Sequence, residues 1–228
     1  GQNGHRNMPL EAISVGNEQR FDGLLRRARK KNHYLLEPEA KSLIDPHIGA
    51  LKKQVKSATT LHRARVGYAK RDHEGFDSAG VYTPYEGATL GAPQPAIAGG
   101  GRMNRPGVAF FYAASNEETA LCEVRPHPGQ VVSVGSFKSV RNLVVADFSS
   151  VSIKDYFMSD ERLNDYWALM SIDRLFSIPM PPEERGDYVT SQLLADVVRQ
   201  LGFDGVVFNS SVGAGLNYAF FDSSAFEY

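Results

Sequence analysis

The sequence contains a single cysteine, Cys122, among its 228 residues. One cysteine excludes an internal disulfide and a multi-cysteine metal site, and it is typical of a protein kept in a reducing cytosol. None of the six histidines stands at metal-ligand spacing from another or from Cys122. The sequence therefore predicts no metal site.

Long apolar runs and net charge are also missing. No apolar stretch approaches the length that spans a bilayer and no signal peptide is visible, so we expect a cytoplasmic protein without membrane contact. The 25 basic residues balance 26 acidic ones. That balance argues against a general nucleic-acid-binding protein, which would carry a basic excess. The apolar fraction of 42% is nevertheless enough to build a core.

The densest group of chemically useful side chains lies between Gly101 and Arg125 (GRMNRPGVAFFYAASNEETALCEVR). The glycines before Arg102 allow backbone conformations closed to other residues. Residues 108–114 form a short aromatic-rich apolar run, which predicts a strand.

A short helix is predicted directly after this strand, over residues 117–124. Ser115 or Asn116 can cap it, and the acidic residues of its first turn suit the helix dipole. A proline two residues beyond Val124 is expected to end it. Ala120 and Glu123 then share one helix face.

Four motifs occur in order along the chain: Leu61-His62-Arg63; Gly101-Arg102-x-Asn104; Tyr112-x-Ala114 followed by Thr119-Ala120-x-x-Glu123-Val124; and Gly202-Phe203-Asp204-Gly205 followed by Asn209-Ser210-Ser211. In this order and spacing they resemble the RES domain family, whose best-known members are toxins of bacterial toxin–antitoxin pairs. The resemblance covers residues 59–221. It implies an ADP-ribosyltransferase-like fold, an α+β split β-sandwich with flanking helices that holds NAD in a cleft.

The first part of the chain lies outside this resemblance. Residues 1–17 are polar and are expected to be a frayed terminus or a cloning remnant. Residues 18–57 carry apolar residues at helical spacing, interrupted by Pro38 and Pro46, and predict a small helical appendage with a basic run at residues 26–31. That run is read as a solvated face, with a surface for RNA or an acidic partner as the alternative.

Residues 58–228 are expected to form the domain proper. Strands are predicted at residues 61–68, 131–137, 143–148, 205–208 and 218–221. Helices are predicted at 159–178, with a core stripe of Leu163, Trp167, Met170 and Leu175, and at 188–201, with Gly202 as its stop. Strands that flank a few helices also indicate a mixed α+β domain.

Residues 71–100 are rich in Gly, Pro, Asp and Ser and predict a long loop. Tyr82 and Tyr85 within it could stack on a flat ring of a ligand. Packing of these tyrosines against the domain surface is the equally weighted alternative.

The resemblance implies that NAD is the substrate and that three residues carry the chemistry. Glu123 would stabilise the oxocarbenium-like ribose of the transition state and orient the acceptor. Arg102, with Arg63 as second choice, would clamp the pyrophosphate through bidentate hydrogen bonds. Tyr112 would stack on the nicotinamide ring.

Further contacts with NAD are expected from Ser210, which matches the family's serine, and from Arg65 and Asn104. Asn209 and Ser211 are equally plausible neighbours of Ser210. Taken without the resemblance, a glutamate on a short helix is usually exposed, a tyrosine in an apolar strand usually belongs to the core, and an arginine in a loop usually lies on the surface.

The expected activity is cleavage of the nicotinamide–ribose bond by a NAD glycohydrolase or phosphorylase that depletes NAD and arrests growth. A mono-ADP-ribosyltransferase with a specific protein target and a non-catalytic nucleotide-binding or interaction module stay open. The resemblance also implies a cognate antitoxin with an Xre-type DNA-binding domain. The N-terminal segment leaves a different inhibitor or homo-oligomer formation open, and no direct contact with nucleic acid is expected.

Overall fold

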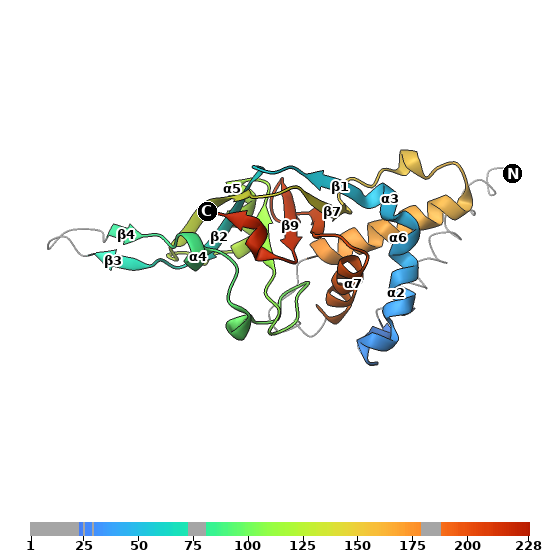
Figure 1. Cartoon of the computed structure of the whole chain (residues 1–228), viewed down its shortest axis with the longest axis horizontal. Helices are drawn as coiled ribbons and strands as arrows, with labels where there is room; N and C mark the ends of the chain where they lie inside the picture. Colours follow the sequence, from blue (N-terminus) through green and yellow to red (C-terminus); the bar gives the residue numbers. More distant parts are fainter. Residues whose placement is uncertain (1–22, 25, 29, 73–80, 179–187) are drawn as a thin grey trace, which may run out of the picture.

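The protein is built around one eight-stranded mixed sheet (Figure 1). The computed structural model describes residues 23–24, 26–28, 30–72, 81–178 and 188–228. In sheet order the strands are β1 (Lys52–Val55), β7 (Leu143–Asp147), β8 (Gly205–Asn209), β9 (Leu216–Phe220), β5 (Phe111–Ala114), β2 (Thr60–Val66), β6 (Val132–Ser139) and β10 (Phe226–Glu227). β7 and β8 are parallel, and the other neighbours are antiparallel. The α+β class expected from the sequence is confirmed.

The sheet opens between β5 and β2. β8, β9 and β5 pair along their lengths, as do β2 and β6. The described ladder between β2 and β5, by contrast, consists of the pair His62 and Ala114. The two halves of the sheet therefore separate next to this pair, which leaves room between them for a pocket.

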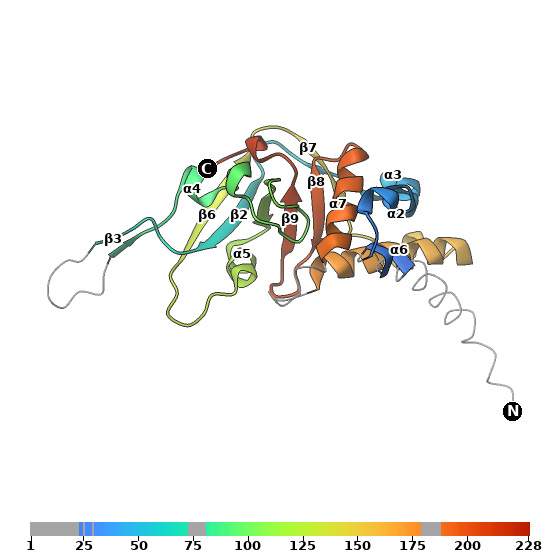
Figure 2. The ribbon, with the colours of Figure 1, turned by 90° about the horizontal axis from the view of Figure 1, so that it is seen from below.

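Helices gather at one end of the sheet. They are α2 (Glu37–Ile44), α3 (Ile48–Leu51), α6 (Asp160–Ser177) and α7 (Val189–Gln200), while α4 (Gly87–Leu90) and α5 (Glu117–Val124) lie nearer β2. Figure 2 shows α7 between β8 and α2, an order that the contacts of these elements support. Short 3₁₀ turns complete the chain: η1 (His33–Leu35), η2 (Asp45–His47), η3 (Pro95–Ile97), η4 (Ile153–Asp155) and η6 (Ser223–Ala225).

The N-terminal residues that the structure describes pack into the main core. Leu24, Leu36, Ala40 and Ile44 are buried in the same apolar cluster as α7, α6 and β8. Ala40 and Ile44 are four residues apart and so share one face of α2, and Leu36 is the N-cap residue of this helix. These side chains fill the layer outside α7, so the segment belongs to the body of the domain. The expected terminus at residues 1–17 lies outside the described residues.

The helical prediction for the end of this segment is wrong. Residues 52–55 form β1, an edge strand that pairs with β7. Lys53 Nζ lies 2.5 Å from the buried carboxylate of Asp147. Val55 is the buried residue of this strand. Contacts with the rest of the protein, rather than a local apolar pattern, therefore determine the conformation of residues 52–55. Pro38 and Pro46 do not interrupt helices either. Both stand in the first turn of a helical element, where a missing N–H costs nothing.

The apolar stripe predicted for α6 is out of phase with the observed core face. Leu169, Ile172 and Phe176 are fully buried and Asp173 nearly so, whereas Trp167 is partly exposed. The hydrophobic pattern missed the observed core face because that face includes a buried polar residue, Asp173. In α7 the predicted face is confirmed, since Leu193, Leu194, Val197 and Val198 are fully buried.

The segment expected to be a loop at residues 71–100 contains regular structure. β3 (Lys70–Asp72) pairs with β4 (Val81–Thr83) in a hairpin that projects from the end of the molecule opposite the helices (Figures 1 and 2). Tyr82 packs edge-on against Tyr68, with ring centroids 4.8 Å apart, and Tyr85 lies under the guanidinium of Arg65. Both tyrosines thus contact protein groups, and stacking of either ring on a ligand stays a prediction.

Candidate active site

A pocket of about 330 Å³ lies where β2 and β5 separate. Its walls come from β2, β5, α5, the C-terminal end of α6, and β8 and β9. The lining residues are His62, Arg63, Ala64, Arg102, Tyr112, Ala113, Ala114, Ala120, Glu123, Val124, Phe176, Ser177, Phe208, Asn217 and Tyr218. Small side chains on both strands and on α5 keep the space open.

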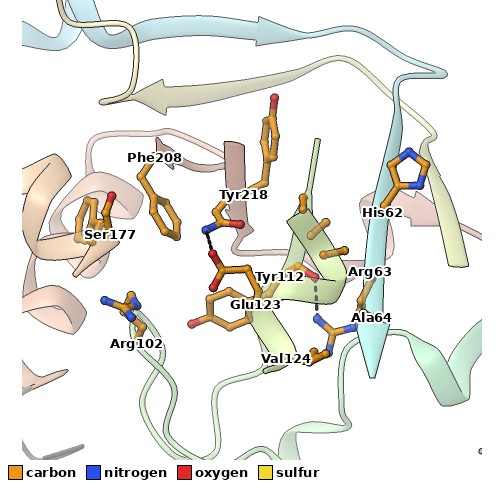
Figure 3. Close-up of a pocket in the computed structure, with 15 residues that line it drawn as sticks. His62, Arg63, Ala64, Arg102, Tyr112, Glu123, Val124, Ser177, Phe208 and Tyr218 are labelled. Atoms are coloured by element: carbon orange, nitrogen blue, oxygen red, sulfur yellow. Dashed lines mark hydrogen bonds between the residues drawn. The ribbon is translucent and has the colours of Figure 1, made fainter. Parts of the chain in front are cut away.

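Glu123 enters the pocket from the last turn of α5. Asn116 caps this helix, since its side chain accepts a hydrogen bond from the backbone N–H of Thr119 at 2.8 Å, and Arg125 ends it in a left-handed conformation. Glu123 Oε1 accepts a hydrogen bond from Ser210 Oγ at 2.7 Å. It accepts a second one from Asn217 Nδ2 at 2.6 Å, drawn as a dashed line in Figure 3. No described residue bonds to its other oxygen. One oxygen is thus fixed, and the other is available to a ligand.

The loop before β5 is organised by Asn104. Its Nδ2 donates to the carbonyls of Gly99 at 2.9 Å and Val108 at 2.7 Å, and its Oδ1 accepts from the hydroxyl of Tyr112 at 2.8 Å. A side chain at Gly101 would overlap Asn104 Oδ1 and approach the Tyr112 hydroxyl to 3.1 Å. The Gly-Arg-x-Asn motif therefore folds the loop tightly against Tyr112.

Arg102 projects from this loop toward the end of α6. One guanidinium nitrogen donates to the carbonyl of Ile178 at 2.6 Å, and the Tyr188 ring lies 5.5 Å from the guanidinium carbon. Burial lowers the pKa of Arg102, while the negative charge of Glu123 acts in the opposite direction. The guanidinium remains charged at neutral pH, and no described carboxylate forms an ion pair with it.

Arg63 spans the opening between the sheet halves. It donates to the carbonyl of Tyr112 at 2.6 Å, across the gap (Figure 3). It also donates to the carbonyl of Leu90 at 2.8 Å. Burial and the neighbouring Arg65 lower the pKa of Arg63 to about 10. Its positive charge is met by carbonyl dipoles and by no described carboxylate, which favours an anionic ligand beside it.

The ring of Tyr112 lines the pocket next to Glu123 (Figure 3). Its hydroxyl is engaged behind the pocket, where it also accepts from the backbone N–H of Met103 at 3.1 Å. Burial raises the pKa of Tyr112 to about 12, so the phenol stays neutral. Tyr112 therefore offers a ligand its aromatic face rather than a titrating hydroxyl.

A family model for the RES domain matches residues 62–228. The chain belongs to the RES domain family. The match begins at the motif on β2 and takes in every wall of the pocket described above. A comparison with curated proteins finds no significant match.

Among solved structures, the RES chain is similar to one described as the crystal structure of the M. tuberculosis MbcT–MbcA toxin–antitoxin complex. The two are 13% identical, with a TM-score of 0.42. The similarity covers 80% of this chain and 86% of the other.

The structure brings four of the predicted residues of the RES site to one pocket: Arg63, Arg102, Tyr112 and Glu123. Ser210 is the serine that contacts Glu123. Its oxygen also accepts from the backbone N–H groups of Val212 and Gly213, at 3.2 and 2.9 Å.

Two predicted ligand contacts lie elsewhere. Asn104 is buried behind Tyr112 with its amide satisfied by the loop. Arg65 lies outside the Glu123 pocket and lines a second groove, where it stacks 4.3 Å from the Tyr85 ring centroid. Both stay predictions as NAD contacts, and their observed partners are protein groups.

Sequence reasoning missed Asn217, Ser177 and Phe208. Asn217 lies near the start of β9, where it pairs with Ala114 of β5, and its amide donates to Glu123. No motif spacing could identify it, because 94 residues separate it from Glu123. The lone asparagine at the head of an apolar strand was the available signal.

Proposed function

We propose that this RES protein is a NAD-consuming enzyme that cleaves the nicotinamide–ribose bond in the pocket between β2 and β5. The arrangement around Glu123 carries the proposal. A carboxylate is held by two donors on one oxygen, leaves its other oxygen to the pocket, and shares that pocket with a tyrosine ring and two guanidinium groups without described acidic partners.

The chemistry requires few groups. The bond between the ribose carbon and the pyridinium nitrogen breaks with its electron pair moving to nicotinamide, which leaves neutral. The ribose carbon becomes an oxocarbenium-like cation, which the Glu123 carboxylate stabilises. Water or phosphate then forms the new bond from the open face, and the proton of an attacking water passes to Glu123 or to solvent.

Shape and charge suit NAD. A pocket of about 330 Å³ is at the lower end of the range for small-molecule sites, so it holds the nicotinamide–ribose half of NAD rather than the whole molecule. Tyr112 would stack on the nicotinamide ring. Arg102 and Arg63 would bind the phosphates leading out of the pocket.

Activity can be tested directly by following nicotinamide release from NAD, with and without phosphate, for the wild type, Glu123→Gln and Glu118→Gln. Glu118 lies exposed on the first turn of the same helix and provides the control. We expect release by the wild type and Glu118→Gln, and a loss of a hundredfold or more, about the size of an electrostatic contribution of this kind, in Glu123→Gln. Phosphate dependence would identify phosphorolysis.

Equal release by all three proteins would contradict the role of Glu123. NAD binding without release would instead favour an ADP-ribosyltransferase that needs its protein target.

Family membership also supports a partner. We propose that the chain acts as a toxin neutralised by a cognate antitoxin with an Xre-type DNA-binding domain that covers this pocket. Co-expression should restore growth that the protein alone arrests, and the complex should no longer release nicotinamide.

A further inference from the structure

Three polar groups of Asn209, the last residue of β8, bond to side chains of α6. The backbone N–H of Asn209 donates to Asp173 Oδ1 at 3.2 Å, and its side-chain Nδ2 donates to Asp173 Oδ2 at 3.1 Å. Its carbonyl accepts from Ser177 Oγ at 2.7 Å, one turn further along α6. The strand end is thus fixed in position and in orientation by two side chains of one helix.

The residue that follows this clamp is Ser210, which holds Glu123. The Ser210 hydroxyl donates to Glu123 Oε1 and accepts from the backbone N–H groups of Val212 and Gly213. Because the hydroxyl has a single hydrogen, its accepting bonds to the loop leave the donor directed at the carboxylate. The position of Ser210 depends on the residue before it.

Asp173 is an unusual residue for a core helix face. Its side chain is buried, and no described cation forms an ion pair with it. Burying an unpaired carboxylate costs folding free energy unless hydrogen bonds compensate, and its two described donors both come from Asn209. Burial accordingly raises the pKa of Asp173, against the effect of the Asn209 hydrogen bonds.

We propose that Asp173 is a positioning residue of the active site, which acts through Asn209 and Ser210 to fix the Glu123 carboxylate. Asp173 does not line the pocket, so it has no contact with substrate. The proposal rests on the proposed function for its kinetic consequences. Its structural consequence, order in the loop between β8 and β9, is independent of what the pocket binds.

The decisive variant is Asp173→Asn. It keeps the size of the side chain but leaves one oxygen atom, so it can accept only one of the two hydrogen bonds from Asn209 in the observed geometry. Asp165→Asn is the matched control, since it makes the same chemical change on the same helix at a more exposed side chain. Should Asp173→Asn fail to fold, Asn209→Ala removes the partner amide at an exposed position instead.

Two readouts are needed. For nicotinamide release, we expect Asp173→Asn to lower kcat by about tenfold to a hundredfold, the size of effect that follows a small displacement of a reacting group, with KM for NAD changed less than about twofold. Ser210→Ala should cost less in the Asp173→Asn background than in the wild type, because both changes interrupt one path.

The second readout is deuterium exchange of the amides at residues 210–216, which should speed up in Asp173→Asn and stay unchanged in Asp165→Asn. Unchanged amide exchange at residues 210–216 in Asp173→Asn would overturn the inference. So would a double variant whose loss of kcat equals the product of the losses in Asp173→Asn and Ser210→Ala. Faster exchange in Asp173→Asn, together with a wild type that releases no nicotinamide, would uphold the positioning role and refute the proposed function.

Discussion

Gly101 lies in the tightest contact beside the site. A methyl group there would overlap Asn104 Oδ1, which is itself bonded to Tyr112, whereas a methyl group at Gly99 would meet no atom within 4 Å. We expect Gly101→Ala to lower the free energy of unfolding by about 1–3 kcal/mol, as overpacking of a fixed polar pair does. Gly99→Ala should stay within about 0.5 kcal/mol. Urea denaturation of the two variants measures the difference, and equal values would contradict the assigned contact.

Asp173 should also make stability depend on pH. Burial raises the pKa of Asp173 above its ordinary value of 3.8, so the folded state binds its proton more tightly than the unfolded state does. Its contribution to stability is therefore fully present below pH 3.8 and falls as pH rises toward the folded-state pKa. The unfolding free energy of the wild type minus that of Asp173→Asn should decrease over this window. A difference in unfolding free energy that stays constant or rises with pH would show that burial does not destabilise the ionised form of Asp173.

At the scale of single residues, spacing and resemblance placed Arg102, Tyr112 and Glu123 in one pocket, because these residues belong to one continuous stretch of chain. The sequence could not reveal the contacts of Asn217 and Asp173, or the bonds that Asn104 makes within its loop. Their contacts join segments that are far apart in the chain or are satisfied inside a loop, and no local pattern records them.

At the scale of elements, β1 depends on contacts with the rest of the sheet. Lys53 is half-exposed, but the Asp147 carboxylate that it meets is almost fully buried. We expect Lys53→Met to destabilise the protein by roughly 1–3 kcal/mol, because it leaves this carboxylate to its bonds with Ser149. Lys52→Met, at the exposed neighbouring position, should be near neutral. Equal loss in both variants would show that strand propensity, and not the ion pair, holds β1.

The elements that were predicted well share a strong local signal. α5 and α7 begin and end close to the expected residues because a cap, a proline or Gly202 marks their limits. β1 and the β3–β4 hairpin carry no such signal, since their residues are largely polar and exposed. Their strand conformation comes from pairing, which a local pattern does not show.

At the scale of the whole molecule, the N-terminal segment and the family domain share one core. Ile44 on α2 is fully buried in the cluster that contains α7 and β8. Ile44→Ala should cost about 2–5 kcal/mol and leave a single unfolding transition. Leu35→Ala, at an exposed side chain, should cost little.

The fluorescence of Trp167 on α6 and the far-ultraviolet circular dichroism should report the same midpoint for Ile44→Ala. A separate early transition would mean that the N-terminal segment folds on its own.

The structure describes no helix long and apolar enough to cross a membrane.

The most direct test of the central claim is a crystal structure of Glu123→Gln with NAD. The account predicts the nicotinamide ring against Tyr112, the ribose carbon beside the residue-123 side chain, and the phosphates on Arg102 and Arg63. NAD bound outside this pocket, or no binding by the folded variant at millimolar NAD, would contradict it.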